Sequence, residues 1–289
     1  MAEEDFQGVE EAEEAQGESL HELLLGVADE RAYARSGNDD AALLATTREE
    51  RTALAVICSM PTLSMIVLMA VGHQTILAMF VFHWICAVAL PLVYMRTFDE
   101  GGWDGVVLFV KRELAGEAVH SRRIAATAFV LILSVGSGVL SLAATQADIE
   151  SIALKPIVDR LSEYHLEFTV FGLTAVGLYF TFLNSFIEEL FWRGFLLERL
   201  GTASRGLAIS SVTYSLYHFV VIRCLLPETW GGISWLLAVF ATVGICMLGL
   251  LLAILHERKG FWVAYAVHAA VDGVVVIVGA VVLSYNSSL

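Results

Sequence analysis

The stretch VFGLTAVGLYFTFLNSFIEELFWRGF at residues 170–195 points to both the class of this protein and its chemistry. It begins with 18 residues that carry no charge. Two adjacent glutamates, Glu188 and Glu189, follow, and Arg193 comes four residues after the second. A bilayer span needs about 20 mostly apolar residues, and an ionisable group inside one normally faces a partner or a water-filled cavity. The stretch therefore indicates a membrane helix that carries functional candidates.

The whole chain has the composition of a membrane protein. Of its 289 residues 57% are hydrophobic and only four are proline, and the mean hydropathy is +0.70. These values lie outside the range of soluble domains. We predict an all-α fold, a multispanning transmembrane helical bundle of about seven spans, at residues 53–72, 75–94, 124–144, 170–192, 206–226, 233–255 and 261–283.

Acidic residues are concentrated at the N-terminus. Residues 1–50 hold 15 Asp and Glu against three Arg, which gives −12 of the chain's net charge of −14. Low hydrophobicity with clustered glutamate is typical of disorder. We therefore predict an acidic, disordered cytoplasmic tail at 1–50 and a transmembrane domain at 51–289.

The basic residues indicate an orientation. If the N-terminus lies inside, 14 of the 17 Lys and Arg fall on the cytoplasmic side. The positive-inside rule favours this arrangement. We expect a multi-pass integral membrane protein with a cytoplasmic N-terminus and, for seven spans, a C-terminus on the other side.

The connection between the second and third spans is amphipathic. Its apolar residues recur at helical spacing, which predicts a helix lying on the cytoplasmic face. The apolar positions are Trp103, Val106, Val107, Val110 and Leu114.

Ionisable residues inside the predicted spans are few. They are Glu188, Glu189, His218, His268 and Asp272, with His73 and His83 in or near the second span. Neighbours on an α-helix point about 100° apart, whereas residues four apart share a face. Glu189 therefore pairs with Arg193, and Glu188, which shares its face with Asn184, is free to act as a general base. We interpret His73 and His83 as structural or interfacial.

Two further pairs follow the same spacing. Tyr214 precedes His218 by four residues, and His268 precedes Asp272 by four. At about 1.5 Å per residue from the cytoplasmic flanks, Glu188 lies roughly 16 Å deep, His218 roughly 20 Å, and His268 and Asp272 roughly 14 to 20 Å. We expect three helices to bring these groups to one level.

These motifs resemble those of the CPBP intramembrane endopeptidases. The sequence EELFWR is similar to the E-E-x-x-x-R signature of that family, and the pairs at 214–218 and 268–272 resemble its F-x-x-x-H and H-x-x-x-N/D motifs. The family is described as glutamic endopeptidases or metalloproteases, and it includes the CAAX prenyl proteases of the Ras-converting type and bacterial self-immunity proteins. The resemblance covers a catalytic core at about residues 170–284.

The resemblance implies a function. The protein would be an intramembrane peptidase that hydrolyses a peptide bond, near the C-terminus of prenylated CAAX proteins, with a glutamate-activated water. Glu188 and His218 would hold the water, while His268 and Asp272 would stabilise the oxyanion. Glu189 and Arg193 form the ion pair expected from their spacing.

The family resemblance also implies which ligands to expect. It requires no cofactor and no metal ion. Its expected partners are a peptide or prenylated protein substrate and membrane lipid, with no nucleic acid.

The sequence departs from the family pattern at two positions. Tyr214 replaces the usual Phe and adds a hydroxyl that needs a partner. Asp272 stands where the prenyl proteases favour Asn, and an ionised carboxylate cannot donate a hydrogen bond to an oxyanion. We therefore expect Asp272 to fix the tautomer of His268 instead.

Three alternatives remain open on the sequence. A family member can serve as a non-proteolytic scaffold or membrane partner protein, because a fold does not guarantee activity. A proton-coupled carrier would use similar buried groups, but the chain lacks a second, inverted set of polar helices. A metalloprotease would use the same ligand types, although the H-E-x-x-H motif is missing.

Overall fold

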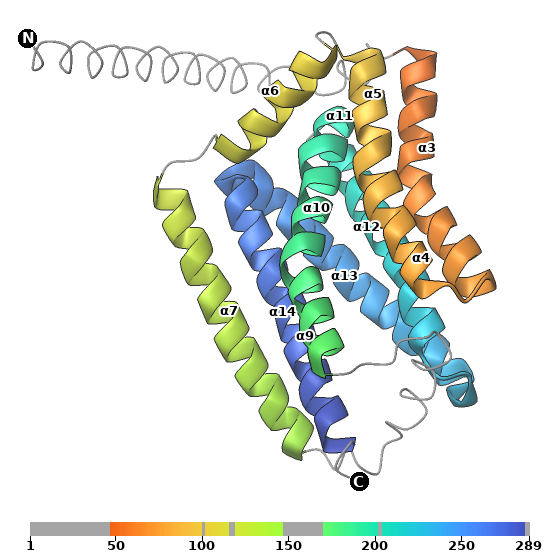
Figure 1. The fold of residues 1–289 in the computed structure, drawn as a ribbon, viewed down its shortest axis with the longest axis vertical. Coiled ribbons are helices and arrows are strands. Elements are labelled where there is room, and N and C mark those ends of the chain that lie inside the picture. Colours follow the sequence, from red (N-terminus) through yellow and green to blue (C-terminus); the bar gives the residue numbers. More distant parts are fainter. Residues whose placement is uncertain (1–46, 100–101, 116–118, 147–169, 202–203, 287–289) are drawn as a thin grey trace, which may run out of the picture. The chain divides into compact units, whose positions relative to one another are not determined.

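The structure is a computed structural model that describes residues 47–99, 102–115, 119–146, 170–201 and 204–286. Within these ranges the chain is helical and contains no strand, as predicted (Figure 1). The acidic tail predicted at 1–50 lies almost wholly outside the described residues and stays a prediction.

Six helices in the described chain are long and apolar enough to cross a membrane. Several contain π-helical stretches, labelled η. They are α3 (Arg48–Ser64) with η1 (Met65–Val71); α4 (Thr75–Phe80), η2 (Val81–Ala89) and α5 (Leu90–Phe98); α7 (Val119–Gln146); α12 (Ser204–Leu225); α13 (Gly232–Lys259); and α14 (Phe261–Asn286). They correspond to six of the seven predicted spans.

The seventh predicted span, at 170–192, is also helical but is not among these six. It is longer than expected, since helical structure continues to Leu200. Along its length it alternates between two helix types: α9 (Val170–Leu178), η3 (Tyr179–Asn184), α10 (Ser185–Glu189), η4 (Leu190–Leu197) and α11 (Glu198–Leu200). We call this element the site helix. The two glutamates therefore lie on a short α-helical piece between two π-helical stretches.

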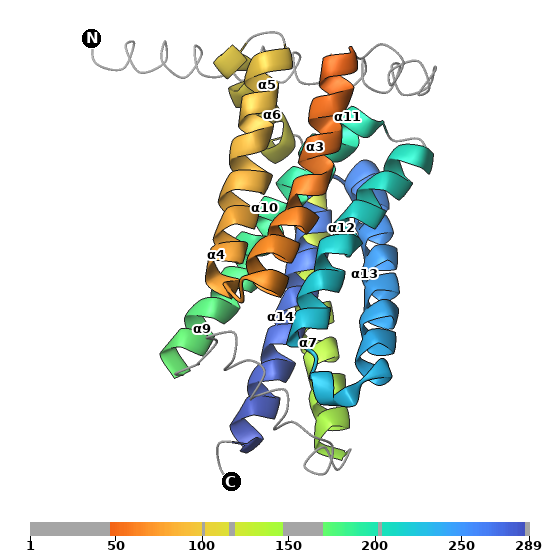
Figure 2. The ribbon, with the colours of Figure 1, turned by 90° about the vertical axis from the view of Figure 1, so that its right-hand side faces the viewer.

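The site helix packs against helices on several sides. α10 contacts α14 and η2, and η4 contacts α12 and α13. Figure 1 shows the site helix in green between α14 and the helix formed by α4 and α5, and Figure 2 shows α12 and α13 from the adjacent side. Helices distant in sequence thus surround the two glutamates and shield them from the surroundings of the bundle.

Local sequence explains where two of the packed helices begin. The Thr47 side chain accepts from the backbone N–H of Glu50, and the Glu50 side chain accepts from that of Thr47, which forms a capping box at the start of α3. At the other end of the chain, Gly260 separates α13 from α14 with a φ of 86°. Glycine adopts this conformation without a steric penalty, so the chain reverses there and places α14 beside α13.

The amphipathic helix predicted after the second span is present as α6 (Gly102–Ala115), but its buried face differs from the prediction. Val106 and Phe109 are buried, whereas Trp103, Val107 and Val110 are exposed. Phe109 approaches Gly194 of the site helix. Simple spacing of apolar residues did not distinguish the packed face of α6 from its exposed apolar face.

Candidate active site

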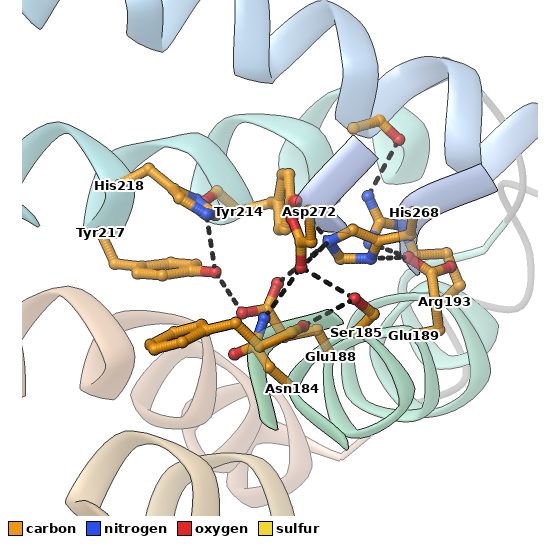
Figure 3. A network of polar contacts seen from close by, with 12 residues as sticks. Asn184, Ser185, Glu188, Glu189, Arg193, Tyr214, Tyr217, His218, His268 and Asp272 are labelled. Carbon is orange, nitrogen blue, oxygen red and sulfur yellow. Dashed lines mark hydrogen bonds and ion pairs between the residues drawn. The ribbon is translucent and has the colours of Figure 1, made fainter. Parts of the chain in front are cut away.

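Three helices bring the six predicted site residues together. α10 and η4 carry Glu188, Glu189 and Arg193, α12 carries His218, and α14 carries His268 and Asp272. Figure 3 shows these side chains converging inside the bundle. Glu188, Glu189 and His268 are each at most 2% exposed. We call these six residues the polar centre.

Glu189 and Arg193 form the buried ion pair that their spacing predicts. Nη1 of Arg193 donates to Oε1 of Glu189 at 2.7 Å, and both side chains are almost fully buried. Nη2 of Arg193 donates to the backbone carbonyl of Gly249 at 3.3 Å, and the guanidinium lies 4.4 Å from the centre of the Tyr214 ring. A buried charge is costly without such partners, so these contacts hold the pair in place.

His268 lies between the two glutamates. Its Nδ1 is 2.7 Å from Oε1 of Glu189, and its Nε2 is 3.7 Å from Oε2 of Glu188. The first distance is a hydrogen bond in which Nδ1–H donates to the carboxylate. Adjacent glutamates therefore approach opposite edges of one imidazole ring.

The Tyr214 hydroxyl finds the partner that the sequence required. Its Oη is 3.2 Å from Nε2 of His268, and the tyrosine is buried. Because Nδ1 of His268 donates to Glu189, Nε2 of the neutral ring is an acceptor, and the Tyr214 hydroxyl donates to it. Together, Glu189 and Tyr214 fix the orientation of the ring.

Asp272 makes other hydrogen bonds than the one we expected. Its Oδ2 is 3.7 Å from Nε2 of His268, which is too long for a direct hydrogen bond. The carboxylate instead accepts hydrogen bonds from Ser185 Oγ at 2.8 Å and Asn184 Nδ2 at 3.2 Å. Glu189 makes the hydrogen bond to His268 that we expected from Asp272, so the role of Asp272 stays a prediction. Asp272 is also the most exposed acid of the polar centre, with a quarter of its side chain accessible.

His218 contacts Glu188 through another residue. Its Nδ1 donates to the backbone carbonyl of Tyr214 at 2.9 Å. Its Nε2 is 3.1 Å from the hydroxyl of Tyr217, which is itself 2.7 Å from Oε1 of Glu188. Tyr217 thus lies between the two residues that the family resemblance pairs directly.

His83 also reaches the site, although we interpreted it as structural or interfacial. It is fully buried in η2, and its Nε2 forms a hydrogen bond with Oδ1 of Asn184. The amide of Asn184 in turn donates to Asp272. The second span is therefore connected to the polar centre by side-chain hydrogen bonds.

Part of the chain matches a known protein family. Residues 170–274 match the family described as type II CAAX prenyl endopeptidase Rce1-like. The resemblance inferred from the motifs is confirmed over this segment. This CAAX endopeptidase-like segment covers 105 of the 289 residues. No curated protein and no solved structure matches the chain.

The CAAX endopeptidase-like segment contains the whole polar centre, from Glu188 to Asp272. It also includes Tyr217 and Gly249, which sequence reasoning missed. Tyr217 directly precedes a candidate histidine, but its side chain carried no motif of its own. Gly249 contributes through its backbone carbonyl, and a backbone contribution leaves little trace in a sequence.

An open apolar pocket lies beside the polar centre. It has a volume of about 290 Å³ and lies between α7, η3 and α14. Its lining includes Phe129, Phe182, Trp262, Tyr265 and Ala269, the last being the residue after His268. The helices that carry Asn184 and His268 therefore also border an apolar space.

The donor groups of the site are largely committed to one another. Nδ1 of His268 and Nη1 of Arg193 share one oxygen of Glu189, and Tyr217 engages Glu188. Within the described ranges, no group of three or more His, Cys, Asp or Glu is arranged to hold a metal ion. The arrangement itself provides a carboxylate base beside hydrogen-bond donors, which are the parts that general acid–base chemistry needs.

Proposed function

We propose that the protein is an intramembrane endopeptidase that hydrolyses a peptide bond with a water molecule activated by Glu188. The observation that supports this most is the state of the two Glu188 oxygens. Oε1 accepts from Tyr217, whereas Oε2 is buried with no hydrogen-bond partner among the described residues. A buried carboxylate oxygen costs free energy without a partner, so this position favours a water or a polar substrate group.

The water binds between Glu188 and His268. The 3.7 Å between Oε2 of Glu188 and Nε2 of His268 exceeds a direct hydrogen bond and is a distance at which a bridging water is to be considered. The family resemblance alone would put this water between Glu188 and His218. We assign it to Oε2 because the Tyr217 hydroxyl already lies between those two residues.

The hydrolytic step needs no covalent intermediate. Glu188 takes a proton from the water as the water oxygen attacks the carbonyl carbon of the scissile bond. When Nε2 of His268 is protonated, the Tyr214 hydroxyl no longer donates to it, and both groups can donate hydrogen bonds to the oxyanion. Glu188 then gives its proton to the leaving amine as the C–N bond breaks, which yields a carboxylic acid and an amine.

A lipidated substrate fits the surroundings of the site. The open pocket between α7, η3 and α14 is lined by apolar and aromatic side chains, which suits a hydrocarbon chain better than a polar peptide. Asp272 is partly exposed and offers an approach to the polar centre. We therefore propose the C-terminal region of a prenylated CAAX protein as the substrate class.

The test uses purified protein in lipid nanodiscs. A peptide with a farnesylated C-a-a-X end and the same peptide without the lipid are incubated with the parent and with Glu188→Gln, and mass spectrometry detects the released fragment. We expect the parent to cleave the farnesylated peptide and Glu188→Gln to lose about 10²- to 10⁴-fold in rate.

Other outcomes separate the alternatives. A folded parent that cleaves neither peptide would favour the non-proteolytic scaffold. Activity that a chelator removes and a divalent metal restores would favour a metalloprotease. Equal rates for the parent and Glu188→Gln would refute the role of this glutamate.

A further inference from the structure

Tyr217 is held rigidly in the interior of the bundle. Its ring stacks on Trp192 with an interplanar angle of 2° and a distance of 6.0 Å between ring centroids. The centroid of the Phe82 ring lies 4.6 Å from that of Tyr217. The residue is 3% exposed. These ring contacts and its burial leave the hydroxyl little freedom to move away from its two polar neighbours, Glu188 and His218.

The Tyr217 hydroxyl has fewer protons to donate than it has neighbours that can accept one. Nδ1 of His218 faces the Tyr214 carbonyl, which only accepts, so Nδ1 carries a proton. Nε2 of the neutral ring is then an acceptor. The Tyr217 hydroxyl has one proton to donate but faces two groups that can both accept, Nε2 of His218 and Oε1 of Glu188.

Two arrangements satisfy every contact with one additional proton. In the first, protonated Glu188 donates to Tyr217, and Tyr217 donates to neutral His218. In the second, the imidazolium of His218 donates to Tyr217, and Tyr217 donates to the Glu188 carboxylate. When Glu188 is ionised and His218 is neutral, the Tyr217 hydroxyl can donate to only one of them. The other contact then has no proton.

We propose that Tyr217 is a proton-relay residue that moves a proton between Glu188 and His218. This inference rests on the proposed function, because the relay converts Glu188 to the carboxylate that activates water. In the transfer, the O–H bond of Glu188 and the O–H bond of Tyr217 break. A new O–H bond forms on Tyr217 and an N–H bond forms on Nε2 of His218, so Tyr217 is neutral before and after.

The relay gives His218 a defined task. Its ring acts through Tyr217 and holds the proton that Glu188 releases from Oε1, while Oε2 faces the water. Tyr217 and His218 are therefore positioning residues for the base, and neither needs to touch the substrate.

The experiment compares the parent with Tyr217→Phe, which keeps the ring and removes only the hydroxyl. Both proteins are labelled with ¹⁵N-histidine and studied by NMR in nanodiscs, and the His218 signals are assigned by their loss in His218→Gln. In the parent we expect Nδ1 to be protonated and Nε2 to have the shift of a hydrogen-bonded nitrogen. In Tyr217→Phe we expect Nε2 to move and Nδ1 to stay protonated.

The same two proteins are compared in single-turnover cleavage of the farnesylated peptide. We expect Tyr217→Phe to be at least about tenfold slower, a smaller loss than the roughly 10²- to 10⁴-fold of a group that transfers the proton to or from the substrate directly. Tyr94→Phe is the matched control, because Tyr94 is also buried but packs against Phe98 and Phe195 away from the polar centre. We expect it to match the parent in both measurements.

The outcomes distinguish the relay from the hydrolase. An unchanged Nε2 signal in Tyr217→Phe, or a parent His218 protonated only at Nε2, would overturn the relay. A moved Nε2 signal with an unchanged rate would also overturn it, since the hydroxyl would then be only structural. A parent that hydrolyses no peptide would overturn the proposed function, and the NMR comparison alone would then decide whether the proton is shared.

Discussion

Gly249→Ala is expected to disturb the polar centre without touching an ionisable residue. A Cβ atom added at Gly249 would lie 2.9 Å from Cδ1 of Tyr214, 3.5 Å from Cα of Ser211 and 3.6 Å from Nη2 of Arg193. Carbon atoms do not normally approach to 2.9 Å, and Tyr214 has little room because its ring also contacts His218. Either Tyr214 or the backbone of α13 must shift.

The size of the effect follows from a matched control. Gly244 lies on the same helix, and a Cβ added there meets no described atom within 4 Å. Both changes gain the helix propensity of Ala over Gly, about 1 kcal/mol, so this contribution cancels between them. The difference is the cost of overpacking, about 1–3 kcal/mol. At roughly 2–4 °C per kcal/mol, Gly249→Ala should unfold about 2–12 °C below Gly244→Ala.

The assay is thermal unfolding of both variants in one detergent, followed by cleavage of the farnesylated peptide. A shift of Tyr214 lengthens its 3.2 Å contact with His268, so we also expect Gly249→Ala to be slower than Gly244→Ala. Equal unfolding temperatures for the two variants would refute the close packing of Gly249 against Tyr214 and Arg193.

Three further predictions concern charge and topology. Glu189→Gln should destabilise the fold by about 3–5 kcal/mol, because it leaves Arg193 unpaired, whereas Glu188→Gln should unfold like the parent. Similar unfolding of both variants would contradict distinct roles for the glutamates. Asp272→Asn should slow cleavage by less than about tenfold, because Glu189 orients His268, and a hundredfold loss would return that role to Asp272. A tag before Met1 should be cytoplasmic and one after Leu289 on the opposite side, and protease protection that finds both tags on one side would reject seven spans.

Spacing along the sequence was sufficient for part of the site. The Glu189–Arg193 pair follows from an interval of four residues, and the structure contains it. The need of the Tyr214 hydroxyl for a partner was also visible, because tyrosine stands where the family has phenylalanine. Both inferences concern neighbours on one helix or a single added atom, and neither depends on how distant helices pack.

Contacts between helices were not predictable in this way. His83 appeared isolated because its partner Asn184 follows it by 101 residues. The role given to Asp272 considered only its own helix, whereas its hydrogen-bond partners Asn184 and Ser185 lie on the site helix. π-helical stretches on both sides of α10 hold more residues per turn and change which side chains share a face. The composition of 170–200 did not indicate these stretches.

The buried ion pair has a consequence for how the protein is made. Gly249, which accepts from Arg193, follows it by 56 residues, and His268, which contacts Glu189, follows that glutamate by 79. Synthesis runs from the N-terminus, so the site helix leaves the ribosome well before α13 and α14 exist. Until then the ion pair lacks both of these contacts, and of the partners described above only the Tyr214 ring on α12 precedes them in the chain. The site helix therefore reaches its final place only after the last two helices are inserted, and a nascent chain stopped before α13 is expected to hold it outside the bundle interior.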